Sequence, residues 1–230
     1  MAQIYGAFPS HRCTGKRMVL FENVDLSQLK YAALSYVWGE KQRITLQRSN
    51  YANLQNRGSL VGRMPRTIED AVYLTGALGV QYLWVDAFCI IQDNNADKEA
   101  QIGNMGNVYA HSLFTIIAAA GGDTETGLPE IRAPRRAVQE EVLIHRPGSG
   151  LPLSLITMLN PTSDQYRHYT EGTVWASRGW TLQERVPTKR AIIVMKEQVL
   201  WACGKSSWAE ETYSETSLAR ASWFALQESE

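Results

Sequence analysis

Glu184 closes a segment in which two tryptophans, a Ser-Arg-Gly turn and a single carboxylate occur together, Trp175-Ala-Ser-Arg-Gly-Trp-Thr-Leu-Gln-Glu184. Ser177 can accept hydrogen bonds from the first backbone N–H groups of a helix, and Gly179 loosens the turn, so the pattern predicts a helix start. Trp180 and Glu184 are four residues apart and therefore share one helical face. A carboxylate beside an indole is partly desolvated, which suits it to stabilise a cation that develops during a reaction.

The same segment also fits an ordinary amphipathic helix, with Trp180 in the core and Glu184 on the surface. Taken alone, the residues favour this second interpretation, because a carboxylate next to an aromatic ring is common in structural helices as well as in active sites. The choice depends on which other side chains the fold brings to Glu184.

A second carboxylate, Asp86, interrupts the apolar run Tyr82–Ile91. A charge in such a run must lie at the carboxyl edge of a sheet or be paired internally, and the ligand crevice of an open α/β sheet lies at that edge. An aspartate that caps the following turn explains the residue equally well. Ser35, Trp38 and Gly39 end an earlier apolar run and should open towards the same crevice, where Trp38 is either part of the core or a stacking surface for a ring.

Other kinds of site have little support in the sequence. Gly121-Gly122 and Gly148-Ser-Gly150 lack both the Walker lysine and the spacing of a dinucleotide-binding loop. The four histidines are scattered and form no metal-binding pattern. Ser35 does not stand in a GxSxG motif, and Cys89, with no histidine near it in the chain, is expected to be a packed thiol. We therefore predict no metal site and no bound cofactor.

The elements that must position these residues are predicted from hydrophobic periodicity. Continuous apolar runs indicate strands buried in a parallel sheet, and patterns of helical spacing lie between them. The strands are expected at 31–38, 82–91 and 113–120, and the helices at 67–78, opened by a capping box over Thr67-Ile-Glu-Asp70, and at 99–111. Alternation of strands and helices is typical of right-handed crossovers. We predict an α/β fold with a mainly parallel sheet flanked by helices.

The later part of the chain changes character. Segments 141–145 and 151–156 flank Pro147-Gly-Ser-Gly150, and segments 190–195 and 198–203 flank Lys196-Glu197, so each pair predicts a β-hairpin. Residues 214–230 have apolar side chains at helical spacing and are expected to start a C-terminal helical extension.

Composition excludes several classes of partner. The 23 Lys and Arg residues balance the 23 Asp and Glu residues, whereas nucleic-acid-binding proteins concentrate positive charge. The longest apolar run is too short to span a bilayer, and the N-terminus lacks the pattern of a signal peptide. Three widely spaced cysteines fit a reducing compartment. We expect a cytoplasmic chain without a nucleic-acid partner and without a membrane span.

Several blocks of the sequence together resemble the HET (heterokaryon incompatibility) domain of filamentous fungi. The matching blocks, in family order, are Tyr31-Ala-Ala-Leu-Ser-Tyr-Val-Trp-Gly39, Met64-Pro-Arg-Thr-Ile-Glu-Asp-Ala71, Tyr82-Leu-Trp-Val-Asp-Ala-Phe-Cys-Ile-Ile-Gln-Asp93, Met105-Gly-Asn-Val-Tyr109, Thr115-Ile-Ile-Ala118, Gly127-Leu128 and Ser177-Arg-Gly-Trp-Thr-Leu-Gln-Glu184. Ala87 and Phe88 depart from the family pattern, which more often shows a small polar residue followed by leucine or another apolar residue. The resemblance implies a single domain over 1–230, with its motif blocks within 31–203, that triggers cell death when genetically different fungal cells fuse.

The HET family is in turn remotely similar to Toll/interleukin receptor (TIR) domains, which have a flavodoxin-like sheet. In TIR domains a first strand ends near a serine and a later helix carries a Trp-x-x-x-Glu-like pair, and some of them use that glutamate to cleave NAD. The resemblance implies Glu184 as the catalytic residue and Ser35, Trp38, Gly39, Asp86, Arg178 and Trp180 as substrate-binding residues, with NAD as substrate. One alternative is a non-catalytic signalling module that acts through self-association or an activating protein partner. Another is a sugar- or nucleotide-sensing domain that uses the same crevice without turnover.

Overall fold

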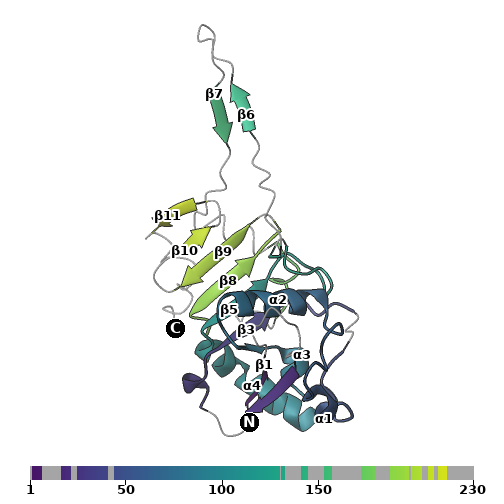
Figure 1. The fold of residues 1–230 in the computed structure, drawn as a ribbon. Coiled ribbons are helices and arrows are strands. Elements are labelled where there is room, and N and C mark those ends of the chain that lie inside the picture. Colours follow the sequence, from purple (N-terminus) through teal and green to yellow (C-terminus); the bar gives the residue numbers. More distant parts are fainter. Residues whose placement is uncertain are drawn as a thin grey trace.

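The computed structural model describes most of the chain between Ala2 and Thr216. The described residues are 2–6, 17–21, 25–40, 44–129, 131–132, 141–144, 153–156, 172–179, 187–196, 198–203, 207–209 and 212–216. Their elements, most of them labelled in Figure 1, are β1 (Ala2–Gly6), β2 (Arg17–Phe21), η1 (Leu26–Gln28), β3 (Tyr31–Ser35), α1 (Tyr51–Leu54), α2 (Arg66–Ala77), β4 (Tyr82–Trp84), α3 (Asp86–Cys89), α4 (Asn95–His111), β5 (Phe114–Ala118), β6 (Glu141–Ile144), β7 (Leu153–Ile156), β8 (Arg190–Val194), β9 (Val199–Cys203), β10 (Ser207–Ala209) and β11 (Thr212–Thr216).

The centre of the fold is a sheet with the strand order β11-β10-β9-β8-β5-β3-β4-β1-β2 (Figure 1). Strands β4, β3, β5 and β8 are parallel neighbours, and the strands on both sides of this group pair antiparallel. The prediction of a parallel sheet is therefore confirmed for the centre, whereas the sheet as a whole is mixed. The fold class is α/β, as predicted.

The crossovers place helices on both faces of the parallel centre. The chain moves from β3 outward to β4 and then back across β3 to β5, so right-handed connections put α2 and α4 on opposite faces. Helix α4 lies on the face of Ala33, because Tyr109 packs edge-on against Trp84, the register partner of Ala33, with ring centroids 5.6 Å apart. The hydroxyl groups of Tyr31 and Tyr109 donate to the carbonyls of Val108 and Leu34 at 2.5 and 3.1 Å, which ties α4 to β3.

The hydrophobic core forms around the two central strands. Every residue of β3 and of β5 is buried, as expected for strands covered on both faces. Their side chains alternate between the faces, so that Leu34 pairs with Ile116 and Ser35 with Ile117.

The two predicted hairpins are present. Strands β6 and β7 form a separate two-stranded antiparallel sheet, which stands away from the large sheet in Figure 1. Strands β8 and β9 form the other hairpin, and β8 also joins the parallel centre as its fourth strand.

Two predicted elements differ from the structure, and one pair of strands was not predicted. The strand expected over 82–91 ends at Trp84, and Asp86–Cys89 form a helical turn, since a short apolar run fits a buried helix as well as a strand. The antiparallel pair β1 and β2 was not predicted. Of the expected C-terminal helix, 214–216 belong to strand β11, and 217–230 lie outside the described residues.

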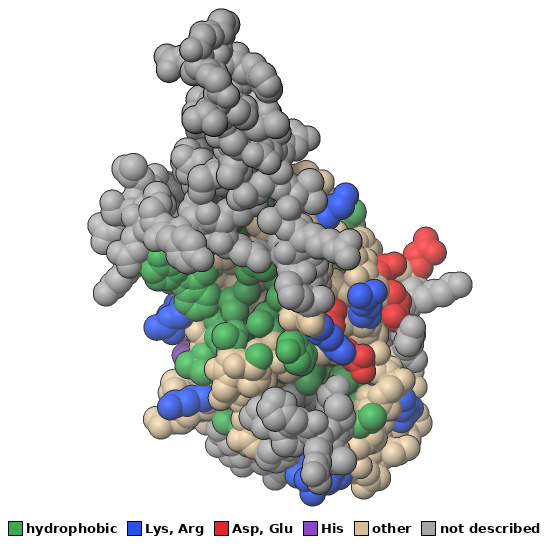
Figure 2. Space-filling view, turned by 45° about the horizontal axis from the view of Figure 1, so that its top comes forward, with side chains coloured by type: hydrophobic (Ala, Val, Ile, Leu, Met, Phe, Trp, Pro, Cys, Tyr) green, Lys and Arg blue, Asp and Glu red, His purple; other side chains and the backbone are tan. Residues whose placement is uncertain are grey.

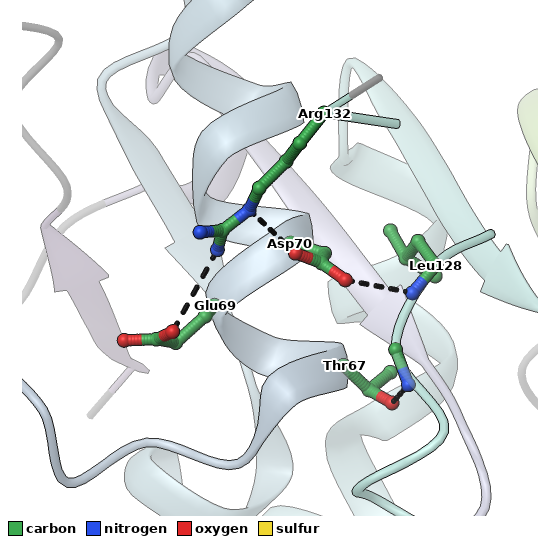
Figure 3. A network of polar contacts seen from close by, with 6 residues as sticks. Thr67, Glu69, Asp70, Leu128 and Arg132 are labelled. Carbon is green, nitrogen blue, oxygen red and sulfur yellow. Dashed lines mark hydrogen bonds and ion pairs between the residues drawn. The ribbon is translucent and has the colours of Figure 1, made fainter. Parts of the chain in front are cut away.

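The expected capping box at the start of α2 is also absent. The N-cap residue is Pro65, which makes no side-chain cap hydrogen bond. Instead Thr67 and Asp70 accept hydrogen bonds from the backbone N–H groups of Gly127 and Leu128, at 3.0 and 2.9 Å (Figure 3). The side chains that resemble a cap therefore fasten the loop after β5 to α2.

Arg132 completes this clasp, which we define as Thr67, Asp70, Gly127, Leu128 and Arg132. Its Nε donates to Asp70 at 2.6 Å and its guanidinium lies 3.7 Å from Glu69 (Figure 3). The guanidinium also lies over the ring of Tyr73, 5.7 Å from the centroid. Arg132 is thus held at the surface of α2 instead of extending freely into solvent.

The described surface carries both signs of charge. On the face drawn in Figure 2, the acidic side chains lie on the right together with several basic ones, and further basic side chains stand apart from them on the left.

Candidate functional site

The candidate site lies at the carboxyl ends of β3 and β4. These strands are parallel neighbours, so the residues that follow them emerge at the same edge of the sheet. Trp38 follows β3, and Asp86 opens the helical turn α3 just after β4. The pairing of the strands brings together two residues that are 48 positions apart in the chain.

The indole of Trp38 donates a hydrogen bond to the carboxyl group of Asp86. The distance from Nε1 to Oδ2 is 2.6 Å, and the backbone N–H of Ala87 donates to Oδ1 at 2.7 Å. Burial raises the pKa of Asp86 above its ordinary value, against the opposing effects of Trp38, Ala87, the Tyr36 side chain and, by charge, Arg178. The carboxyl group therefore experiences both a low-polarity environment and several donors, a combination found at many functional sites.

Arg178 reaches the same place from a segment far along the chain. Its Nη1 donates to the backbone carbonyl of Tyr36, so the guanidinium is fixed beside the segment that carries Trp38. The side chain is half-buried. Arg178 thereby adds a positive charge to the surroundings of Asp86.

These three side chains line one pocket of ≈ 170 Å³. Helix α4 supplies its opposite wall through Lys98, Ile102 and Met105, which recur at helical spacing and therefore share one face. The full set of lining residues is Trp38, Asp86, Ile90, Gln92, Lys98, Ile102, Met105 and Arg178. The pocket thus combines an apolar wall, an indole, a carboxyl group and two cationic side chains.

Ser35 has a different environment from the one expected. It is 1% exposed and does not line the pocket described above. Its Oγ accepts a hydrogen bond from the indole Nε1 of Trp175 at 2.7 Å, and Trp175 is also buried. This contact holds the segment 172–179 against β3 and so positions Arg178, which is three residues further on.

Gly39 allows the backbone conformation of the loop after β3. It has a φ of 70°, the left-handed region that favours glycine. A Cβ atom here would stand 2.6 Å from the Cβ of Asp123, so the close approach of the loops after β3 and β5 also requires glycine. Gly39 does not line the pocket.

Trp180 and Glu184 lie outside the described residues. Their predicted roles in catalysis and substrate binding therefore stay predictions.

The signals in the sequence for the rest of the pocket are weaker. Ile102 and Met105 belong to the helical pattern over 99–111, but that pattern does not tell which side chains face the sheet edge. Lys98 stands one helical turn before Ile102, and this spacing is the signal in the sequence that places Lys98 on the same face of the helix. Among the described residues, no group of His, Cys, Asp and Glu could hold a metal ion, and no helix there is long and apolar enough to cross a membrane.

The comparisons with known proteins agree with the sequence blocks. The family model described as "Heterokaryon incompatibility protein (HET)" matches residues 31–184. The chain is similar to "Heterokaryon incompatibility protein 6, OR allele" of Neurospora crassa, with 24% identity over 199 residues that cover 80% of this chain and 25% of the relative. It thus spans a quarter of the length of this curated relative. No solved structure matches the chain. Since the family model covers more than half of the sequence and includes every described residue that lines the pocket, the chain belongs to the heterokaryon incompatibility (HET) family.

Proposed function

We propose that this chain is a cell-death effector domain of fungal non-self recognition and that it hydrolyses NAD at the nicotinamide–ribose bond. The observation that supports the proposal best is the convergence of Trp38, Asp86 and Arg178 at one pocket. These residues come from three separate segments and meet at the sheet edge where open α/β folds bind their ligands. The comparisons support the first half of the proposal, because heterokaryon incompatibility is what the family and the relative are named for.

The order of the parallel strands supports a TIR-like interpretation of the fold. Numbered along the chain, the parallel strands β3, β4, β5 and β8 have the spatial order 2-1-3-4, which is the beginning of the flavodoxin-like order 2-1-3-4-5. Glu184 precedes β8 in the chain, as the catalytic glutamate of a TIR-like enzyme would. The antiparallel strand β9 stands where the fifth parallel strand of a flavodoxin-like sheet would lie.

The proposed reaction needs one well-placed carboxylate. Water adds to the anomeric carbon of the ribose while the bond to nicotinamide breaks, giving ADP-ribose, neutral nicotinamide and a proton. The leaving group is already activated by its positive charge, so no acid is needed to protonate it. Glu184 would hold the ribose hydroxyls and stabilise the oxocarbenium-like centre, with Trp38 as an aromatic wall and Asp86 and Arg178 as polar contacts.

The test is a comparison of Glu184→Gln with the unaltered chain in NAD consumption, thermal unfolding and cell killing. The substitution keeps the size of the side chain and removes its charge, so turnover should fall by roughly a hundred- to a thousandfold. Glu99→Gln, at an exposed position of α4 that does not line the pocket, is the matched control and should leave turnover unchanged.

The outcomes separate catalysis from assembly. If Glu184→Gln folds normally and kills cells as well as the parent, the catalytic proposal is wrong and a non-catalytic assembly module takes its place. If Glu184→Gln unfolds, Glu184→Asp serves instead, because it keeps the charge and shortens the side chain.

A further inference from the structure

We infer that the pocket of Trp38, Asp86 and Arg178 is the binding site for the phosphate part of a nucleotide, and that Lys98 is its second cationic contact. The inference deepens the proposed function, on which it rests only for the identity of the nucleotide: in NAD the bound group would be the pyrophosphate. Lys98 was not among the residues expected to bind substrate.

The charges that line the pocket favour an anion. Among the described residues that line it, Asp86 is the one acidic side chain, and Lys98 and Arg178 are the basic ones. The carboxyl group of Asp86 already accepts from the Trp38 indole at 2.6 Å and from the Ala87 N–H at 2.7 Å. Its charge is therefore compensated by donors of the protein itself, and among the described lining side chains two cations face this one carboxyl group.

The two cationic side chains differ in how firmly they are held, and each suits a different kind of contact with phosphate. Arg178 is half-buried and anchored to the Tyr36 carbonyl, so its planar guanidinium is held in one orientation, which suits two-point contact with phosphate oxygens. Lys98 is exposed and lies in the first turn of α4. Its flexible side chain can follow a phosphate group as a point charge.

The remaining walls suit the uncharged part of a nucleotide. Ile90, Ile102 and Met105 form an apolar wall, and Trp38 offers an aromatic surface. The volume of ≈ 170 Å³ is smaller than the roughly 300–1,000 Å³ of pockets that enclose a whole small ligand. The pocket therefore accommodates the phosphates with the adjoining sugar, and the rest of the nucleotide extends beyond it.

The experiment measures binding without turnover, using ADP-ribose, inorganic pyrophosphate and adenosine as probes in titration calorimetry. Lys98→Gln is compared with Lys30→Gln, which makes the same change at an exposed lysine before β3, at the opposite end of the strand from the pocket. Lys98→Gln should weaken the binding of ADP-ribose and pyrophosphate roughly three- to tenfold and reduce its dependence on salt, whereas Lys30→Gln should not. Lys98→Arg keeps the charge and should bind both probes nearly as well as the parent.

Two results would overturn the inference: equal affinities for Lys98→Gln and Lys30→Gln, or adenosine binding as tightly as ADP-ribose. The outcome is independent of the proposed hydrolysis. A chain that binds pyrophosphate through Lys98 but consumes no NAD keeps the phosphate site and loses the proposed reaction. A chain that consumes NAD with unchanged affinity in Lys98→Gln keeps the reaction and loses the phosphate site.

Discussion

The carboxyl group of Asp86 is under two opposed influences whose balance can be measured. Burial favours its neutral form, while the donors Trp38 and Ala87 favour the charged form, and the net effect is a pKa above the ordinary value of 3.8. The folded chain therefore retains a proton on Asp86 over a pH range in which the unfolded chain has lost it. Stability from this group is fully present below about pH 3.8 and is lost as the pH rises through the pKa of the folded state.

This linkage gives a prediction for Asp86→Asn. As the pH rises from about 3.8, the free energy of unfolding of the parent should fall relative to that of the variant, which has no proton to lose at this position. Urea unfolding at a series of pH values measures the difference. Parallel stability curves for the two proteins would contradict the prediction, whatever the constant offset caused by the altered hydrogen bonds.

At the scale of residues, the sequence predicted where Asp86 lies better than it predicted which side chains contact each other. It indicated that Asp86 stands at the sheet edge or is paired internally, and the structure shows both features. It did not indicate that Trp38 is the partner, because that contact depends on β3 and β4 being neighbours. For the same reason the bond between Ser35 and Trp175 was out of reach of local patterns.

At the scale of elements, the clasp on α2 determines where the loop after β5 lies. Asp70 is buried and accepts both the Leu128 N–H and the Arg132 guanidinium. Removing a buried acceptor leaves its donors unsatisfied, which costs more than the net value of the hydrogen bonds.

The pair Asp70→Ala and Glu69→Gln tests this difference. Asp70→Ala should lower the free energy of unfolding by about 2–4 kcal/mol, because it leaves the Leu128 N–H and the Arg132 guanidinium without their acceptor. Glu69→Gln alters only the longer 3.7 Å contact of a half-exposed guanidinium, so its effect should stay below about 1 kcal/mol. Urea denaturation of both variants measures the two effects. Equal losses would show that the clasp does not depend on the buried carboxylate.

Helices and strands were predictable where the hydrophobic periodicity fits only one kind of element. Strands β3 and β5, helices α2 and α4 and both hairpins follow from apolar runs, helical spacing and turn residues. The run 82–91 was predicted wrongly as one strand, because its apolar residues fit a strand followed by a buried helical turn equally well. The Thr67 and Asp70 side chains were predicted wrongly as a cap, because their partners are about sixty residues away in the chain.

At the scale of the whole molecule, β3 and β5 are the best protected part of the sheet. Both are fully buried and have parallel neighbours on each side, whereas β2 and β11 are its outermost strands. Amide groups in such a centre exchange only through large-scale opening.

Hydrogen exchange followed by mass spectrometry should therefore show the slowest exchange in peptides that contain 31–35 and 114–118. Peptides from β1 and β2 should exchange faster, because β2 is an outermost strand of the sheet and β1 lies next to it. Equal protection of 2–6 and 31–35 would argue against β3 as the centre of the cooperative unit.

The order of the strands could not be predicted from the sequence, although the α/β class could. Alternating patterns indicate crossovers, but they do not tell that β8, late in the chain, joins β5 or that β1 pairs with β4. Composition and charge gave no information about these neighbours either.

The bonds from Trp175 to Ser35 and from Arg178 to Tyr36 span 140 and 142 positions of the chain. During translation, β3 therefore leaves the ribosome long before the residues that cover its carboxyl end have been made. A nascent chain that has reached Asp86 but not Arg178, or one released in this range by a premature stop codon, contains Trp38 and Asp86 but no Arg178. For a domain proposed to trigger cell death, this order of synthesis withholds the complete pocket until Arg178 has been made.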